Sequence, residues 1–174
     1  MQSKFIPTPG NRPNTRADAL HVFKVLQDGG VAVVPTEAGY ALMASSTDAV
    51  QRAFAAKRRR LGHSQAFIGL HRLHRALHDL PDDKLDMIRV LHQDLDMSFG
   101  IVAPFRPDHP LIQKLSPPAL EMTTRSGTVR VYIGGGSLLA ELGRLNDETG
   151  QLWSDHGDGA EVSRGYRTRD PGRG

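Results

Sequence analysis

The sequence of 174 residues contains no cysteine. Disulfide bonds, thiolate metal sites and cysteine nucleophiles are therefore excluded. Long apolar runs are also missing: the first 15 residues contain no apolar leader segment, and no run of about 18 apolar residues occurs anywhere. We therefore expect a soluble, cytoplasmic protein that does not associate with a membrane.

Two well-known functional motifs are absent as well. The phosphate-binding pattern GxxxxGK[ST] does not occur, and neither does the GxSxG pattern that presents a nucleophilic serine on a strand-to-helix turn. Hydrophobic residues make up only 39% of the chain, whereas it contains 18 glycines and 11 prolines. This composition predicts many turns or a loosely packed end.

Positive charge is concentrated in one part of the chain. The net charge is only +3 and the isoelectric point about 9.5, yet four basic residues are consecutive over 57–60, and Arg72 and Arg75 follow soon after. Residues 79–86, by contrast, are acidic. A local basic cluster fits phosphate or nucleic-acid binding, and its simpler interpretation is a solvated helix end.

The apolar pattern predicts helices that alternate with strands. The first helix has Thr15 as a plausible N-cap and ends at Gly29–Gly30, and the second is capped by Ser46 or Thr47. We expect helices over 15–28, 47–60, 72–80, 82–95 and 137–145, a helical turn within 109–120, and strands over 31–35, 64–71, 97–105 and 127–133.

This order of elements predicts one α/β domain with a twisted mixed sheet and flanking helices. We expect an extended arm over 1–16, the domain over 17–150 and a polar tail over 151–174. The tail is rich in glycine, aspartate and arginine, so it has little to bury and we expect it to form no fold of its own.

The segment VAVVPTEAGYAL, residues 31–42, changes character halfway. A strand that is apolar on both sides suits a covered position inside a sheet. Pro35 must then end the strand or lie at a sheet edge, and Gly39 permits a positive φ. Thr36, Glu37 and Tyr40 would extend from the carboxyl end of the strand, where open α/β sheets bind ligands. An ordinary turn is the alternative.

Two further clusters carry weaker signals. Gly134–Gly136 follow a strand and precede a helix, so their amides could hold phosphate, although such turns are common. His71, His74 and His78 share one helical stripe, but arginines crowd them and no carboxylate lies among them. We expect an exposed polar helix face there and predict no metal site.

In this order, the motifs resemble the YrdC/YciO-like family, whose members have a helix, GG, an apolar strand and a P-T-[ED]-x-x-Y-x-L motif. Residues 26–42, LQDGGVAVVPTEAGYAL, follow that pattern, and the ending GYAL is closest to the YciO branch. Lys57 and Arg59 match the family's K-x-R motif, and Gly62–His63 again resemble the YciO branch. The resemblance covers about residues 17–145 and is weaker after residue 63.

The resemblance implies a YrdC-like sheet around a basic cleft that binds nucleotide and, in some members, double-stranded RNA or tRNA. The best understood members use threonine, bicarbonate and ATP, with Mg²⁺, to form threonylcarbamoyl-adenylate for tRNA modification. Their threonine and tyrosine line the substrate pocket, and the K-x-R pair holds phosphates. The binding residues implied in this chain are Thr36, Tyr40, Lys57, Arg59, His63 and Arg130.

The chain departs from the family pattern at its distal motifs. The P-G-P-x-T element is replaced by DMSFG, which puts Gly100 in place of a threonine. The family arginine of the V-R-x-P strand aligns with Tyr132, or with Arg130 after a slip of two residues. The S-[TA]-S-A-N-x-S-G segment has no counterpart.

These departures remove charge-assisted contacts to a nucleotide. We therefore expect a nucleotide- and RNA-binding domain with degenerate catalytic motifs, linked to tRNA modification. The alternative is an active threonylcarbamoyl-adenylate synthase that uses ATP and Mg²⁺. A homodimer is left open.

Overall fold

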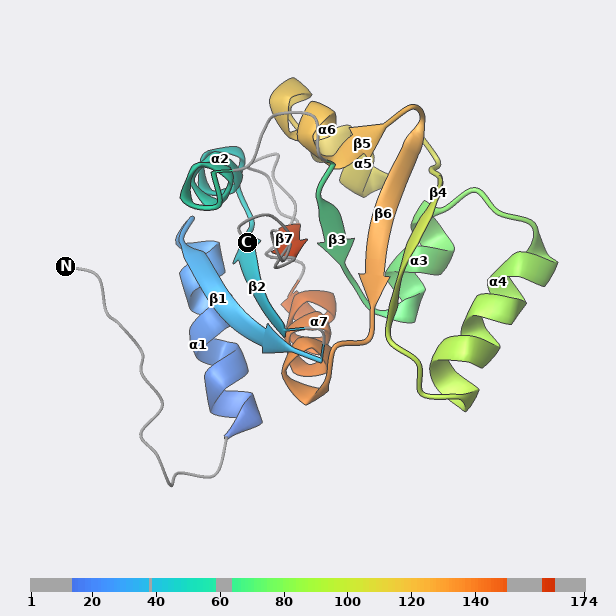
Figure 1. Ribbon diagram of the computed structural model, residues 1–174, viewed down its shortest axis with the longest axis horizontal. Helices are drawn as coiled ribbons and strands as arrows, with labels where there is room; N and C mark the ends of the chain where they lie inside the picture. The colour runs from blue at the N-terminus through green and yellow to red at the C-terminus, as the bar shows by residue number, and fades with distance from the viewer. Residues whose placement is uncertain (1–13, 38, 59–63, 150–160, 165–174) are drawn as a thin grey trace, which may run out of the picture.

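In the computed structural model, the chain forms one mixed β-sheet with helices packed on both faces (Figure 1). The structure describes residues 14–37, 39–58 and 64–149, together with the backbone of 161–164. The strands are β1 (Val31–Thr36), β2 (Gly39–Ala44), β3 (Ala66–Ile68), β4 (Phe99–Pro104), β5 (Thr124–Arg125), β6 (Thr128–Ile133) and β7 (Glu161–Arg164).

The helices connect these strands. They are α1 (Thr15–Gln27), α2 (Thr47–Ala56), α3 (His71–Leu77), α4 (Asp82–Arg89), the π-helix η1 (Val90–Asp94), α5 (Pro110–Lys114), α6 (Pro117–Thr123) and α7 (Ser137–Thr149). The α/β class with a mixed sheet and flanking helices is thus confirmed. No helix in the described part of the chain is both long and apolar enough to cross a bilayer.

The strand order is β1-β2-β7-β3-β6-β4, and β5 pairs with β6. Only the β3–β6 pair among these described strands is parallel. The prediction that β1 is an inner strand is wrong. β1 lies at the edge of the sheet, where proline is tolerated because a strand edge needs no hydrogen-bond donor on its open side. Val33 of this strand is 63% exposed.

The two faces of the sheet pack against different helices. On one face, Ala32 and Val34 of β1 pack with buried residues of α1 and α7. On the other, Val129 and Val131 of β6 pack with residues of α3, α4 and α5. The helix α2 forms a smaller cluster of its own with the end of β2 and with α6. The core therefore follows the alternation of side chains along each strand.

Several element boundaries differ from those expected. Asn14, not Thr15, caps α1, because its side chain accepts a hydrogen bond from the Ala17 amide. The helix predicted over 82–95 changes from α4 into the π-helix η1 at Val90, and Leu95 beyond it is 60% exposed. Residues 109–120 hold two short helices, each with proline in its first turn.

The segment predicted as a tail contributes a strand. The backbone of β7 pairs with β2 on one side and with β3 on the other, so it lies inside the sheet. These four residues thus add a strand to the sheet of the domain, a contribution that the sequence did not indicate. Residues 150–160 and 165–174 lie outside the described part of the chain, as do residues 1–13 of the predicted N-terminal arm.

Candidate functional site

The tip of the β1–β2 hairpin and the start of α7 enclose a cavity of about 310 Å³. The hairpin turns directly after Thr36, which pairs with Gly39. The turn therefore points Thr36 and Glu37 toward the first residues of α7. The cavity is lined by Thr15, Asp18, Pro35, Thr36, Glu37, Gly135, Gly136, Ser137 and Leu138.

Three glycines bring the chain from β6 to this cavity. Gly134, Gly135 and Gly136 all have positive φ, which side-chain-bearing residues rarely adopt. The amide of Gly135 donates to Ser98 Oγ at 3.1 Å. A Cβ atom on Gly136 would lie 4.0 Å from Glu37 Oε1. The loop therefore approaches the glutamate closely without filling the cavity.

The lining offers two opposite kinds of group. The amides of the first turn of α7 have no acceptor within their own helix, and the positive end of the helix dipole favours an anion there. Asp18 and Glu37 offer carboxylate oxygens, which Mg²⁺ prefers. A magnesium-bound phosphate would use both kinds of group. Within the described residues, no group of three or more acidic, histidine or cysteine side chains could hold a metal by itself.

Of the predicted binding residues that the structure describes, Thr36 alone lines this cavity. The hydroxyl of Thr36 donates to the Gly39 carbonyl at 2.9 Å, which holds the hairpin turn closed. Tyr40 pairs with Pro35, the residue before Thr36. Its side chain therefore extends from the face of the hairpin opposite to that of Thr36, and it is 73% exposed. Thr36 and the glycine loop are thus brought together, and Tyr40 is not part of this cavity.

The basic residues predicted to bind phosphate lie elsewhere or cannot be placed. Lys57 is the C-cap of α2, and Arg130 is exposed on β6. Neither lines the cavity. Arg59 and His63 lie outside the described residues. The roles of these four residues, and the basic cleft, stay predictions.

Arg130 and Tyr132, the two candidates for the family arginine position, differ in burial. Both project from the same face of β6. Tyr132 is buried in the cluster under α1 and α7, whereas Arg130 is exposed. The Arg130 side chain lies beside Gly100, with its Cδ 3.9 Å from where a glycine-replacing Cβ would stand. Of the two, Arg130 is the one that a ligand in solution can reach.

The histidine stripe is not an exposed face, contrary to expectation. His74 and His78 are fully buried, with their Nδ1 atoms 2.6 Å apart. The Nε2 atom of His78 lies 3.3 Å from the Val129 carbonyl oxygen. Burial, reinforced by the neighbouring His78, lowers the pKa of His74 to about 4. These histidines are neutral structural groups at neutral pH.

Sequence reasoning missed four residues of the cavity: Thr15, Asp18, Ser137 and Leu138. Thr15 looked like a capping residue at the start of a helix, and Ser137 like an ordinary first helical residue. Their separation in sequence hides that α1 and α7 begin near the same hairpin tip. A glycine run followed by serine at a helix start was the available signal for Ser137.

The family comparison agrees with the sequence motifs. The family model named Sua5_yciO_yrdC, described as "Telomere recombination", matches residues 24–118 of the chain. The match therefore includes the hairpin with Thr36 but ends before the glycine loop. No curated protein sequence matches the chain significantly.

Three solved structures share the fold. A hypothetical protein from Streptococcus mutans UA159 is 24% identical with a TM-score of 0.69, over 94% of this chain and 60% of that one. P. abyssi Sua5 complexed with L-threonine is 16% identical with a TM-score of 0.60, over 88% of this chain and 39% of that one.

A double variant of P. abyssi Sua5 is 15% identical with a TM-score of 0.62, over 88% of this chain and 41% of that one. The chain thus spans between two fifths and three fifths of the length of these proteins. At these identities the likeness establishes the fold.

Proposed function

Because the chain belongs to the Sua5/YciO/YrdC family, we propose that it is a nucleotide- and RNA-binding domain with a phosphate subsite beside Thr36. One observation carries this proposal: the family's P-T-E motif and the glycine loop before α7 line a single cavity. Neither feature alone specifies a ligand. Together they present backbone amides, a helix N-terminus and two carboxylates to one small volume.

Within the proposed subsite, each group has a distinct task. The amides of Gly136 and of the first turn of α7 bind phosphate oxygens, since they point outward from the positive end of the helix. Asp18 and Glu37, which line the same cavity, hold Mg²⁺. When bound, the ion neutralises phosphate charge that these carboxylates would otherwise repel.

RNA is the second ligand in this proposal. Lys57 and Arg58 are both described at the end of α2, and the basic run continues beyond them in the sequence. Consecutive basic side chains contact phosphates without reading base sequence. We assign the backbone of a double-stranded RNA or tRNA to this run, consistent with a role linked to tRNA modification.

An active threonylcarbamoyl-adenylate synthase is the second candidate. The fold shared with P. abyssi Sua5, whose structure contains L-threonine, favours it. Against it, DMSFG stands where the family has a threonine-containing motif, and the S-[TA]-S-A-N-x-S-G segment has no counterpart. We rank binding ahead of turnover because several contacts to the adenylate would be missing, each worth about 1.5–3 kcal/mol.

Calorimetric titration of ATP with and without Mg²⁺ tests the phosphate subsite. We expect Glu37→Gln to weaken magnesium-dependent binding about tenfold and to leave binding without the ion within about twofold. Asp48→Asn is the matched control, because Asp48 is an exposed carboxylate in the first turn of α2 outside the cavity. Equal effects of the two substitutions would contradict the subsite.

Pyrophosphate release from ATP in the presence of threonine and bicarbonate separates the two candidates. No release from protein that binds ATP supports the binding domain. Release that disappears in Lys57→Ala would establish the synthase instead.

The RNA proposal has its own measurement. We expect Lys57→Ala combined with Arg59→Ala to weaken RNA binding and to flatten its salt dependence, since each lost phosphate contact lowers the slope by about 1. An unchanged slope would place RNA elsewhere on the protein.

A further inference from the structure

The helix α4 and the π-helix η1 lie at the β4 end of the sheet, away from α1 and α2 (Figure 1). Large hydrophobic side chains are exposed there, and we call them together the α4 surface: Met87, Val90, Leu95 and Met97. Single exposed hydrophobic residues are ordinary on a protein. Several of them gathered within residues 87–97 form a patch of the kind that marks an interaction site.

The π-helix brings Leu95 to this surface. An α-helix continuing past Val90 would place Leu95 two turns after the buried Ile88, on the side that faces the core. Instead, the Leu95 amide donates to the Val90 carbonyl at 3.1 Å, five residues back, so the wider turn places Leu95 above Val90. Met87 precedes Val90 by three residues on the same side of α4. Three apolar side chains therefore follow one another along the helix.

Met97 extends the surface beyond the helix. Its amide donates to the Leu91 carbonyl at 3.1 Å, so the chain after η1 folds back against the helix end. Methionine stands at both the first and the last position of the α4 surface. Its side chain is flexible and polarizable, and it is common on protein surfaces that adapt to a partner.

Aspartates surround these apolar side chains. Residues 82–97 contain five aspartates, one lysine and one arginine, so their formal charge is −3, in a chain whose total charge is +3. Asp83 lies one helical turn before Met87, and Asp86 has the same relation to Val90. All five aspartates are exposed: Asp82, Asp83, Asp86, Asp94 and Asp96.

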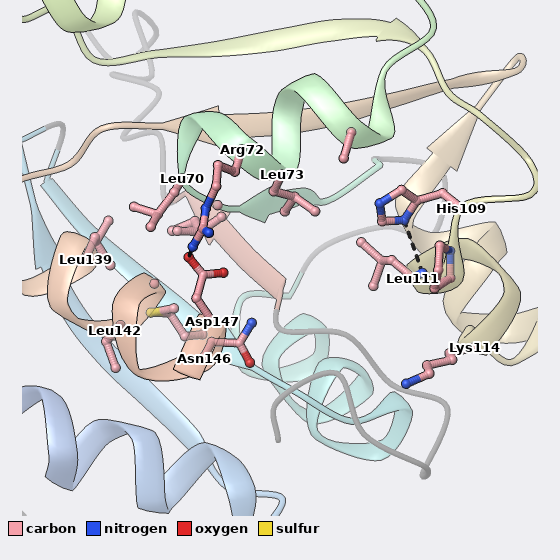
Figure 2. Close-up of a pocket in the computed structure, with 16 residues that line it drawn as sticks. Leu70, Arg72, Leu73, His109, Leu111, Lys114, Leu139, Leu142, Asn146 and Asp147 are labelled. Atoms are coloured by element: carbon pink, nitrogen blue, oxygen red, sulfur yellow. Dashed lines mark hydrogen bonds and ion pairs between the residues drawn. The ribbon is translucent and has the colours of Figure 1, made fainter. Parts of the chain in front are cut away.

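The arginines of the neighbouring helix α3 do not cancel this charge. Arg72, on the rim of a cavity of about 450 Å³ between α3, α5 and α7, points to Asp147 of α7 and forms an ion pair with it (Figure 2). Arg75 lies 3.5 Å from Asp86, and both side chains of this pair are largely exposed, so the pair is weak. With Arg75 counted in, the formal charge around the α4 surface is still −2.

We infer that the α4 surface binds a basic amphipathic helix of a partner protein. The apolar stripe of such a helix packs along Met87, Val90 and Leu95, whose spacing over successive turns suits helix-on-helix packing. Lysine or arginine side chains beside that stripe face the aspartates. The inference is independent of the cavity beside Thr36, which is lined by other residues.

The charge around the α4 surface disfavours other occupants. Aspartates repel both the phosphates of RNA and an anionic lipid surface. A second copy of this chain, docked through the same surface about a two-fold axis, would place these aspartates against their own equivalents. A basic partner turns the same charges into an attraction.

Fluorescence anisotropy with labelled synthetic peptides tests the kind of partner. The first peptide, of about 15 residues, carries leucine at helical spacing and lysine elsewhere. The second has glutamate in place of lysine, and the third has the residues of the first in an order without an apolar stripe. We expect the first to bind about tenfold more tightly than either of the others. Equal binding of the second or the third peptide, or no binding of the first, would overturn the inference.

Substitution of an exposed leucine locates the docking site. Leu95→Gln removes an apolar side chain that is exposed in the free protein. We expect an unchanged circular dichroism spectrum and about tenfold weaker binding of the lysine peptide, and Met87→Gln should show the same pattern. Leu20→Gln is the matched control, because Leu20 is an exposed leucine of α1 outside this surface. Its affinity should stay within about twofold, and a loss equal to that of Leu95→Gln would overturn the assignment.

Removal of two aspartates tests the charge. Asp83→Asn combined with Asp96→Asn should weaken the lysine peptide about tenfold. Asparagine keeps the side-chain size and tolerates the φ of 50° at Asp96. Asp28→Asn combined with Asp48→Asn makes the same change in net charge at exposed positions of other elements. Equal losses in the two double variants would mean that net charge, not this surface, attracts the peptide, and would overturn the inference.

Sedimentation of the protein without peptide tests the competing occupant. We expect an oligomeric state that Leu95→Gln does not change. A dimer that Leu95→Gln dissociates would make a second copy of the chain the occupant of the α4 surface, and would overturn the inference.

Discussion

At the scale of single residues, the buried pair His74–His78 fixes its own proton positions. His78 faces the Val129 carbonyl oxygen with Nε2, and only an N–H can bond to a carbonyl, so Nε2 carries the proton. Its Nδ1 atom must then accept the hydrogen bond from His74 Nδ1. This leaves the lone pair of His74 Nε2 buried, with no partner among the described residues.

This arrangement predicts a loss of stability on acidification. The pKa of His74 is about 4 in the folded chain and 6.5 when unperturbed, so between these values only the unfolded chain binds the proton. The free energy of unfolding should therefore fall by about 2 kcal/mol as the pH is lowered from 6.5 to 4. Urea unfolding across this range measures it.

His74→Gln is expected to reduce that pH dependence, because it removes one of the histidines whose pKa is lowered in the folded chain. His21→Gln is the matched control, since His21 is exposed on α1, and it should keep the wild-type slope. A wild-type protein whose unfolding free energy stays constant between pH 6.5 and 4 would contradict the assignment of neutral buried histidines.

The histidine stripe also shows what the sequence could and could not predict. The spacing of His71, His74 and His78 correctly predicts a helix that carries His71 and His74, whereas His78 is the C-cap, directly after its last residue. It does not tell which side faces the core, because imidazole is polar and is found in both environments. The deciding partner, Val129, lies 51 residues further along the chain.

At the scale of elements, the sequence predicts the first strand of the β1–β2 hairpin but not the second. The run VAVV and Pro35 correctly indicate a strand that reaches an edge or an end. The return strand over Gly39–Ala44 was missed, because glycine and an exposed tyrosine at its start are typical of a loop. Its register becomes visible only in the pairs Pro35 with Tyr40 and Thr36 with Gly39.

Gly39→Ala is predicted to destabilise the protein by about 1–2 kcal/mol. Gly39 has a φ of 115°, and a Cβ atom there would meet nothing within 4 Å, so backbone strain is the whole effect. Gly100→Ala is the control, because the nearest atom would be Arg130 Cδ at 3.9 Å, an ordinary contact. Chemical denaturation compares the two; similar losses would argue against strain at the hairpin.

At the scale of the whole molecule, β7 connects two parts of the sheet. Among the described strands, it is the one that pairs with both β2 and β3. Without it, the β1–β2 hairpin would not be hydrogen-bonded to β3, β6 and β4. The sequence around β7 is polar and rich in glycine, so no apolar pattern predicts this strand. It is identified only from its backbone pairing in the structure.

Deletion of β7 should therefore weaken the entire fold. A chain ending at Thr149 loses several backbone hydrogen bonds, about 3–5 kcal/mol in total. For a chain of this size, this loss corresponds to a melting temperature lower by about 10 °C. A chain ending at Arg164 keeps β7 and serves as the control. Equal melting temperatures for the two truncated chains would show that β7 does not support the sheet.

The position of β7 in the chain also determines when the sheet can be completed during synthesis. Glu161 of β7 pairs with Ala44 of β2, so about 120 residues separate the two partners along the chain. At about 5–20 residues per second, a ribosome needs on the order of ten seconds to deliver the missing strand. During that interval the nascent hairpin exposes the β2 edge, and this edge is where we expect chaperones to bind the growing chain.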